Sequence, residues 1–163
     1  VGYLHIVTPV LLDRWQHRVV NLHDADLSIM AGGVPRYRGL RSTRDAIFDG
    51  ASETRTTAHL VTPEVDTGPP LLLSWAFPTH PMIADLRRMG ATDGLKAYAY
   101  AQREWMMRTA WGPLLLRTVR LYATGAVRVL DGRLFVGTRS APVRLRGPGL
   151  EPERQRPAVG EGR

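Results

Sequence analysis

The chain has 163 residues, of which 44% are hydrophobic and 23% charged, and it has no cysteine. This composition predicts one globular domain with a sizeable core, and it excludes disulfides, thiolate metal sites and cysteine nucleophiles. The net charge of +7 comes from basic residues spread along the chain, which indicates a weak attraction for anionic ligands rather than a nucleic-acid-binding segment.

No apolar run approaches the roughly 18 residues of a membrane span. The opening residues VGYLHIVTP also lack the basic stretch of an export signal. We therefore expect a cytoplasmic protein without a membrane segment. The first residue is valine, which indicates processing, trimming or a partial reading frame.

The first part of the chain predicts two strands joined by a short helical turn. Residues 3–8 read as a buried strand ended by Pro9, residues 10–15 as the turn and residues 18–22 as the second strand. This order suggests a parallel pair in an α/β sheet, where ligands bind beyond the carboxyl ends of the strands. Asn21 and His23 fall at such an end.

Residues 24–39 contain several glycines without sustained periodicity, and we expect a surface loop of functional length. A helix should follow, capped by Ser42 or Thr43, reaching Phe48 and closed by Gly50.

Two apolar strands are expected at residues 54–62 and 71–77, and Asp66 lies on the turn between them. Prolines and a glycine restrict this turn, so Asp66 is presented from a stiff loop. Taken alone, an Asp-x-Gly is most often a turn aspartate that bonds its own backbone.

The second half predicts a short helix at residues 85–89 and a long helix from Asp93. The long helix is interrupted at Gly112-Pro113 and continues through Tyr122. A hairpin around Asp131-Gly132 follows. We expect residues 1–137 to form the catalytic domain and residues 138–163, rich in Pro, Gly and Arg, to form a disordered tail.

Asn21, His23 and Asp66 make a compact chemical set if the fold brings them together. An imidazole and an amide can both donate hydrogen bonds to an oxygen on which negative charge develops. A carboxylate beside the imidazole orients it and can accept protons. Such a set suits acyl-type transfer through a tetrahedral intermediate without a protein nucleophile.

Three motifs in this order resemble the folate-dependent formyltransferases. The resemblance lies in NLHDADL, PRYRGL and TAHLVTPEVDTGPPLLL, and it extends over residues 1–137. The family includes glycinamide ribonucleotide, methionyl-tRNA and sugar-nucleotide formyltransferases and formyltetrahydrofolate deformylase. It implies an α/β fold with a mixed sheet flanked by helices, although the chain lacks the family's N-terminal Rossmann-like strands.

The resemblance implies formyl transfer from 10-formyltetrahydrofolate to an amine acceptor. His23 and Asn21 would stabilise the oxyanion, and Asp66 would assist proton transfer. The folate would be flanked mainly by backbone of the first strand and of the loop around Asp66. The implied binding residues are Tyr3, Leu4, His5, Ile6, Val65, Thr67 and Gly68.

Two departures from the family pattern affect the site. Asp24 follows His23 where the family usually has proline, and extra residues at 28–34 change the pocket rim. Without the family's first strands, the strand at residues 3–8 has an apolar edge that invites pairing. We expect a fragment of a longer protein, or association with a second copy or a partner chain through this edge.

Other interpretations stay open. Asp66-Thr67-Gly68 is also the motif of aspartic proteases, which need a second such loop. A metal site is a further alternative, since zinc or manganese ligands could be supplied by His23, Asp24 and Asp26, with His59 or His5 completing the set. We nevertheless expect no metal, and we expect His59 to be a hydrogen-bonded histidine within the sheet.

Within the family, a non-catalytic folate binder, a partner subunit or a formyltetrahydrofolate hydrolase are the alternatives. The sequence leaves the acceptor undefined. A phosphorylated, nucleotide-linked or small amine is compatible with the basic charge, and tRNA is not excluded.

Overall fold

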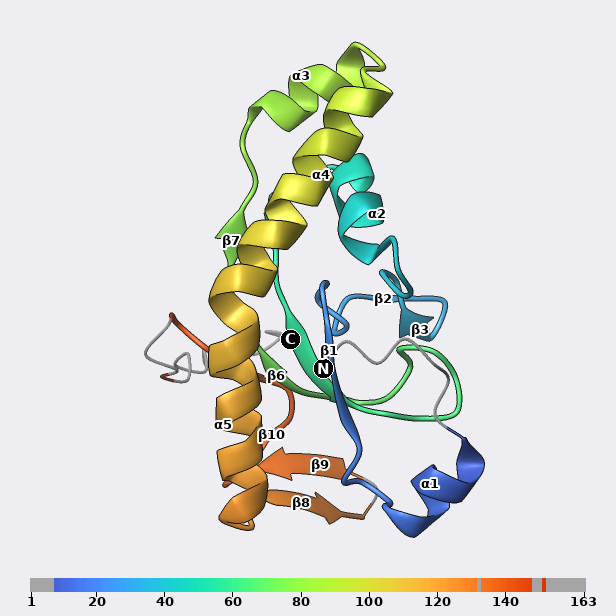
Figure 1. Ribbon diagram of the computed structural model, residues 1–163, viewed down its shortest axis with the longest axis vertical. Helices are drawn as coiled ribbons and strands as arrows, with labels where there is room; N and C mark the ends of the chain where they lie inside the picture. Colours follow the sequence, from blue (N-terminus) through green and yellow to red (C-terminus); the bar gives the residue numbers. More distant parts are fainter. Residues whose placement is uncertain (1–7, 132, 148–150, 152–163) are drawn as a thin grey trace, which may run out of the picture.

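The computed structural model describes residues 8–131, 133–147 and 151. Its main feature is a long helix that runs along the molecule (Figure 1). This helix consists of α4 (Thr92–Met106), a π-helical turn, η1 (Met107–Trp111), and α5 (Gly112–Ala123). The expected interruption at Gly112-Pro113 thus takes the form of a π turn, after which the helix continues.

A four-stranded mixed sheet lies beside the α5 part of this helix (Figure 1). Its order is β1 (Val20–His23), β5 (Thr57–Leu60), β6 (Pro70–Leu73) and β11 (Val143–Arg144). The first two pairings are antiparallel and the last is parallel. The sheet confirms the expected mixed α/β class. Residues 3–7 of the expected first strand lie outside the described residues, and its last residue, Thr8, is the N-cap of the first helix.

The core forms where the helix covers this sheet. Leu114 and Leu121 of α5 pack with buried side chains of all four strands and of the neighbouring hairpin. Because α5 places apolar residues at helical spacing toward strands buried on that face, one continuous apolar cluster results. Its other members are Leu22, Ala58, Leu60, Leu71, Leu72, Val136, Val143 and Leu145.

Shorter elements surround this framework. The helices are α1 (Pro9–Arg14), α2 (Ser42–Asp49) and α3 (Met82–Arg88). The remaining strands are β2 (Met30–Ala31), β3 (Val34–Pro35), β4 (Glu53–Thr54), β7 (Phe77–Pro78), β8 (Val127–Leu130), β9 (Arg133–Val136) and β10 (Arg139–Ser140).

The helix and hairpin predictions were largely right. Gly50 ends α2 in the left-handed region with φ 81°, and β8 pairs with β9 after Asp131. The predicted cap of α2 is wrong, because Arg41 occupies the N-cap without a side-chain bond. The hydroxyl of Thr43 instead donates to the carbonyl of Asp24 at 2.6 Å.

Two segments differ from the expected loop and tail. The first residues of the loop, Asp24 to Leu27, are buried, and β2 and β3 form a hairpin farther along it. Of the expected tail, residues 139–140 and 143–144 form strands, because buried Val143 and Leu145 supply apolar contacts to the core. Residues 148–150 and 152–163 lie outside the described range. No helix in the described part of the chain is long and apolar enough to cross a membrane.

Candidate active site

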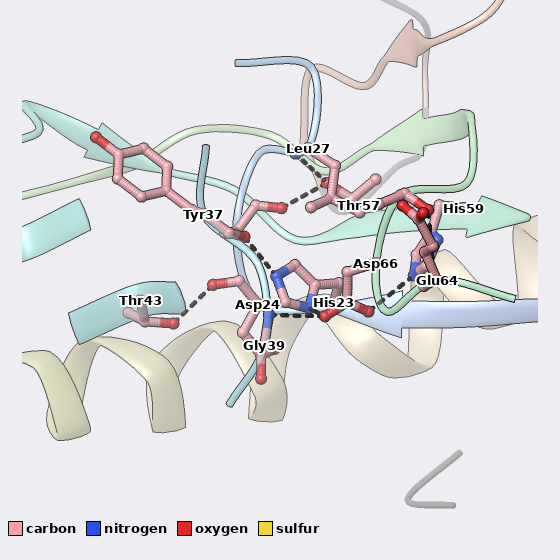
Figure 2. Close-up of polar contacts among 12 residues, drawn as sticks. His23, Asp24, Leu27, Tyr37, Gly39, Thr43, Thr57, His59, Glu64 and Asp66 are labelled. Carbon is pink, nitrogen blue, oxygen red and sulfur yellow. Dashed lines mark hydrogen bonds and ion pairs between the residues drawn. The ribbon is translucent and has the colours of Figure 1, made fainter. Parts of the chain in front are cut away.

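His23 occupies the end of β1 and is 7% exposed. Its Nε2–H donates to the carbonyl of Tyr37 at 2.8 Å. Its Nδ1 atom lies 3.3 Å from Oδ2 of Asp66. The two contacts fix the imidazole from both sides, as Figure 2 shows.

Asp66 reaches His23 from the loop between β5 and β6. Its backbone is left-handed, with φ 54°, a conformation that aspartate tolerates better than most residues. The backbone N–H of Gly39 donates to Oδ2 at 2.8 Å. Thr62 and Thr67 bond across the loop through their hydroxyls at 2.9 Å, which closes it below Asp66. These bonds restrain the loop that presents the Asp66 carboxylate.

Gly68 allows the loop to fold against β5. A Cβ atom built on Gly68 would lie 1.8 Å from the carbonyl oxygen of Leu60, closer than any real contact. The neighbouring carbonyl of Pro69 accepts a hydrogen bond from the N–H of Leu60 at 3.0 Å. Glycine is thus required by this close approach, which sets where Asp66 stands relative to the sheet.

His59 of β5 is the second histidine at this carboxylate. Its Nε2 lies 3.6 Å from Oδ1 of Asp66, and its Nδ1–H donates to the carbonyl of Leu60 at 2.8 Å. Within the described part of the chain, Nε2 is buried without a hydrogen-bond partner. Burial lowers the pKa of His59 below its ordinary 6.5, an effect that the attraction of Asp66 does not overcome. The expectation of a hydrogen-bonded histidine is met at Nδ1 but not at Nε2.

The contacts of His23 restrict where its ring can carry hydrogen. Since Nε2 donates its hydrogen to Tyr37, a neutral ring would turn the Nδ1 lone pair toward Oδ2 of Asp66, placing two acceptors face to face. A proton between Nδ1 and Oδ2 removes this conflict. The arrangement is therefore suited to holding and moving a proton at the His23–Asp66 contact.

Asn21 shares the face of the sheet that carries the two histidines. It lies two residues before His23 on β1 and directly opposite His59 in the antiparallel register. Alternation along a strand and direct pairing across strands both put these side chains on one face. Asn21, His23 and Asp66, which the sequence grouped together, thus come from one strand and the loop that faces it.

The predicted folate-binding residues divide into two groups. Val65, Thr67 and Gly68 flank Asp66 on its loop, and Val65 is 56% exposed. Thr67 is tied into the loop through bonds to Thr62 and to the carbonyl of Glu64. The four predicted residues of the first strand, Tyr3, Leu4, His5 and Ile6, lie outside the described residues.

Asp24, which the sequence offered as a possible metal ligand, contacts the long helix in the structure. Its carboxylate accepts a hydrogen bond from Nε1–H of Trp111 at 2.6 Å and lies 2.9 Å from Nε of Arg103. Burial raises the pKa of the Asp24 carboxyl, and these partners only partly offset the effect. Across residues 8–131, 133–147 and 151, no three His, Asp or Glu side chains are grouped closely enough to hold a metal ion.

The fold and site together define an α/β protein with acid–base groups gathered at a strand end and on the adjoining loop. The Formyl transferase family model matches residues 1–87, which is 87 of the 163 residues. The chain belongs to this family.

Similar proteins agree with this assignment. Phosphoribosylglycinamide formyltransferase of Escherichia coli is 34% identical over 71 residues, which are 44% of this chain and 30% of that protein. The trifunctional purine biosynthetic protein adenosine-3 of Chironomus tentans is 33% identical over 67 residues, 41% of this chain and 4% of that protein. The match thus spans less than a third of either curated relative.

Solved structures show the same fold. Phosphoribosylglycinamide formyltransferase from Anaplasma phagocytophilum superimposes with a TM-score of 0.58 at 21% identity, over 89% of this chain and 60% of that one. Formyltetrahydrofolate deformylase from Pseudomonas syringae gives a TM-score of 0.51 at 23% identity, over 82% of this chain and 37% of that one. At these identities the likeness concerns the fold alone.

Proposed function

We propose that the chain transfers a formyl group from 10-formyltetrahydrofolate to an amine acceptor, using Asn21, His23 and Asp66. The observation that carries the proposal is the 3.3 Å contact between Nδ1 of His23 and Oδ2 of Asp66, at the end of the strand that also holds Asn21. Membership of the formyl transferase family supports the chemistry. Here 10-formyltetrahydrofolate is a substrate, the formyl donor.

The reaction needs two fixed donors and one proton acceptor. The nitrogen of the acceptor attacks the formyl carbon, and the carbonyl electron pair moves to its oxygen. N–H groups of Asn21 and His23 donate to this oxygen, while Asp66 takes the proton that leaves the attacking nitrogen, directly or through water. The bond between the formyl carbon and folate nitrogen then breaks, and that nitrogen takes a proton.

His23 must give up one of its present polar contacts before its ring can donate to the substrate oxygen. In the described state its two ring nitrogens face the Tyr37 carbonyl and Asp66. One of these contacts gives way when the ring donates to the substrate oxygen. Because Asp66 remains anchored by the Gly39 N–H, the carboxylate keeps its place during the exchange.

The loop around Asp66 offers apolar and backbone groups for contact with the donor. Exposed Val65 offers apolar surface, and its neighbours offer backbone groups beside the carboxylate. Several bacterial relatives are named phosphoribosylglycinamide formyltransferase, which favours a phosphorylated amine as acceptor. The net charge of +7 is compatible with a phosphate on that acceptor.

The test uses the 163-residue chain. We would titrate a non-hydrolysable analogue of 10-formyltetrahydrofolate, then measure acceptor formylation and formate release for wild type, His23→Ala and Asp66→Asn. Exposed His80 supplies the control substitution His80→Ala. Formylation that is lost in the two site variants and kept in the control is the expected result.

Other outcomes identify the alternatives. Binding without turnover would make the chain a non-catalytic folate binder or partner subunit. Release of formate without acceptor formylation would make it a hydrolase. A folded sample that does not bind the analogue would overturn the proposal altogether.

A further inference from the structure

A buried carboxylate follows His23 directly in the chain. The side chain of Asp24 is 7% exposed, and its two oxygens face Trp111 and Arg103 at 2.6 and 2.9 Å. Its backbone carbonyl accepts the hydroxyl of Thr43 at 2.6 Å. One residue is therefore held by α2, by α4 and by η1.

The π turn brings the two side-chain partners onto one face of the long helix. Arg103 and Trp111 are eight residues apart, a spacing that in a regular α-helix leaves the second residue about 80° around the axis from the first. A π turn accommodates one extra residue, so eight residues behave as about seven, or two full turns. Since η1 spans Met107–Trp111, it begins after Arg103 and ends at Trp111, so the extra residue falls within this interval and aligns the two partners.

These contacts fix the chain on the carboxyl side of His23. The next residues are fixed as well, because the hydroxyl of Thr57 donates to the carbonyl of Ala25 and accepts from the N–H of Leu27. The polar contacts of the His23 ring within the described residues are to Tyr37 and Asp66. A shift of the Asp24 peptide would therefore be transmitted to the ring through one backbone unit.

Burying a carboxylate is unfavourable unless its partners compensate. Asp66 contacts the imidazole directly, whereas Asp24 is joined to His23 through the backbone and turns its carboxylate to Trp111 and Arg103. A merely structural contact between β1 and the long helix could be made by apolar side chains. The directional bonds of Asp24 instead determine both the position and the rotation of the strand end.

We propose that Asp24 is a positioning residue for His23: Trp111 and Arg103 hold its carboxylate and thereby keep the His23 ring in register with Asp66. The kinetic consequence rests on the formyl transfer proposed above. The positional consequence does not, because it can be observed at the imidazole without any substrate.

The test compares Asp24→Asn, Asp24→Ala and Trp111→Phe with two matched controls. Asp26→Asn changes another buried acid of the same segment, whose carboxylate bonds locally to Ser28. Arg108→Gln changes an exposed cation of η1 whose partner is the half-buried Glu104. Circular dichroism and thermal unfolding establish that each variant is folded.

The readout is the pair of ring 15N signals of His23 in long-range 1H–15N spectra. The chain has five histidines, so His23→Gln identifies the signals by their loss. We expect them to move in Asp24→Ala and Trp111→Phe and to overlay wild type in both controls. Asp24→Asn keeps an acceptor for Trp111 but loses the charge facing Arg103, so an intermediate shift is expected.

In the kinetic arm, kcat should fall about tenfold to a hundredfold in Trp111→Phe, with KM within about twofold of wild type. Unchanged ring signals in folded Asp24→Asn and Trp111→Phe would overturn the inference, even if Asp24→Ala does not fold. Shifted signals together with a wild type that transfers no formyl group would uphold the positioning role and overturn the proposed function.

Discussion

His59 and Asp66 face each other across 3.6 Å, between Nε2 and Oδ1, while the other oxygen of Asp66 lies 3.3 Å from Nδ1 of His23. The two imidazole planes stand at 84° with their centres 6.3 Å apart. One carboxylate therefore contacts two buried imidazole rings, and the left-handed backbone of Asp66 orients it toward both. Removing its charge should affect the site far more than the fold.

Asp66→Asn tests this difference. Asparagine also tolerates the left-handed region, so the turn should be retained. Formyl transfer should fall by about 100-fold or more, the range expected when a positioned proton acceptor is lost. Acceptor formylation under single-turnover conditions measures the effect.

Asp131→Asn is the matched control for this prediction. Asp131 is a second left-handed aspartate, with φ 50°, and it lies on the exposed turn after β8. It should keep full activity. Equal losses in the two variants would mean that turn geometry, and not the carboxylate at the histidines, controls the reaction.

Gly68→Ala should displace the loop that carries Asp66. The added Cβ would meet the Leu60 carbonyl oxygen at 1.8 Å, and the next residue, Pro69, accepts a hydrogen bond from the N–H of Leu60. We expect a loss of about 1–3 kcal/mol in the free energy of unfolding, as for overpacked sites. Chemical denaturation measures it.

Gly112→Ala should have the opposite effect on the free energy of unfolding. A Cβ on Gly112 meets no described atom within 4 Å, and the residue is helical. Alanine there should raise the free energy of unfolding by about 0.5–1 kcal/mol. A Gly68 variant as stable as wild type would show that the loop can move away from Leu60 without cost.

The sequence was sufficient for features set by local chemistry. The glycine that ends α2 and the aspartate turn before β9 were predicted correctly because each depends on a left-handed residue at a fixed place in the chain. Asn21 and His23 were grouped because both fall at the predicted end of a strand. Asp66 was added to them as a carboxylate on a restricted turn, and the resemblance of its motif strengthened the grouping.

Long-range contacts were beyond the sequence. His59 appeared to be an ordinary sheet histidine because nothing in its neighbourhood indicates that Nε2 faces Asp66. Arg103 and Trp111 lie about 80 residues or more from Asp24 in the chain. β11 was missed because Val143 and Arg144, among other arginines and a proline, carry no strand signal, although both residues pair in parallel with β6.

The buried state of His59 predicts how stability depends on pH. Burial lowers the pKa of His59 below 6.5 in the folded protein, so the unfolded chain binds a proton that the folded chain does not. The free energy of unfolding should therefore fall as pH decreases through the unfolded value of about 6.5, and this contribution should level off below the folded pKa. Urea denaturation at several pH values between about 8 and 5.5 measures it.

His59→Asn isolates this contribution, since its amide can still donate to the Leu60 carbonyl without titrating in this range. Its stability should vary less with pH than that of wild type. His80→Asn, at an exposed position, should follow wild type. Parallel curves for His59→Asn and wild type would contradict a proton uptake by His59 on unfolding.

Tyr122 should show its burial in alkaline titration. Its hydroxyl donates to the carbonyl of His17 at 2.6 Å, joining α5 to the segment before β1, and burial raises its pKa to about 12. A raised folded pKa means that the stabilisation is fully present below the unfolded value of about 10 and is lost as pH rises toward 12. Ultraviolet absorbance should show an ionisation phase near pH 12, and Tyr122→Phe should remove this phase and cost about 0.5–1.5 kcal/mol near neutral pH. Tyr100→Phe is the control, because Tyr100 is 66% exposed, and it should leave both the late phase and the stability unchanged. A late phase that survives in Tyr122→Phe would assign the high pKa to another tyrosine.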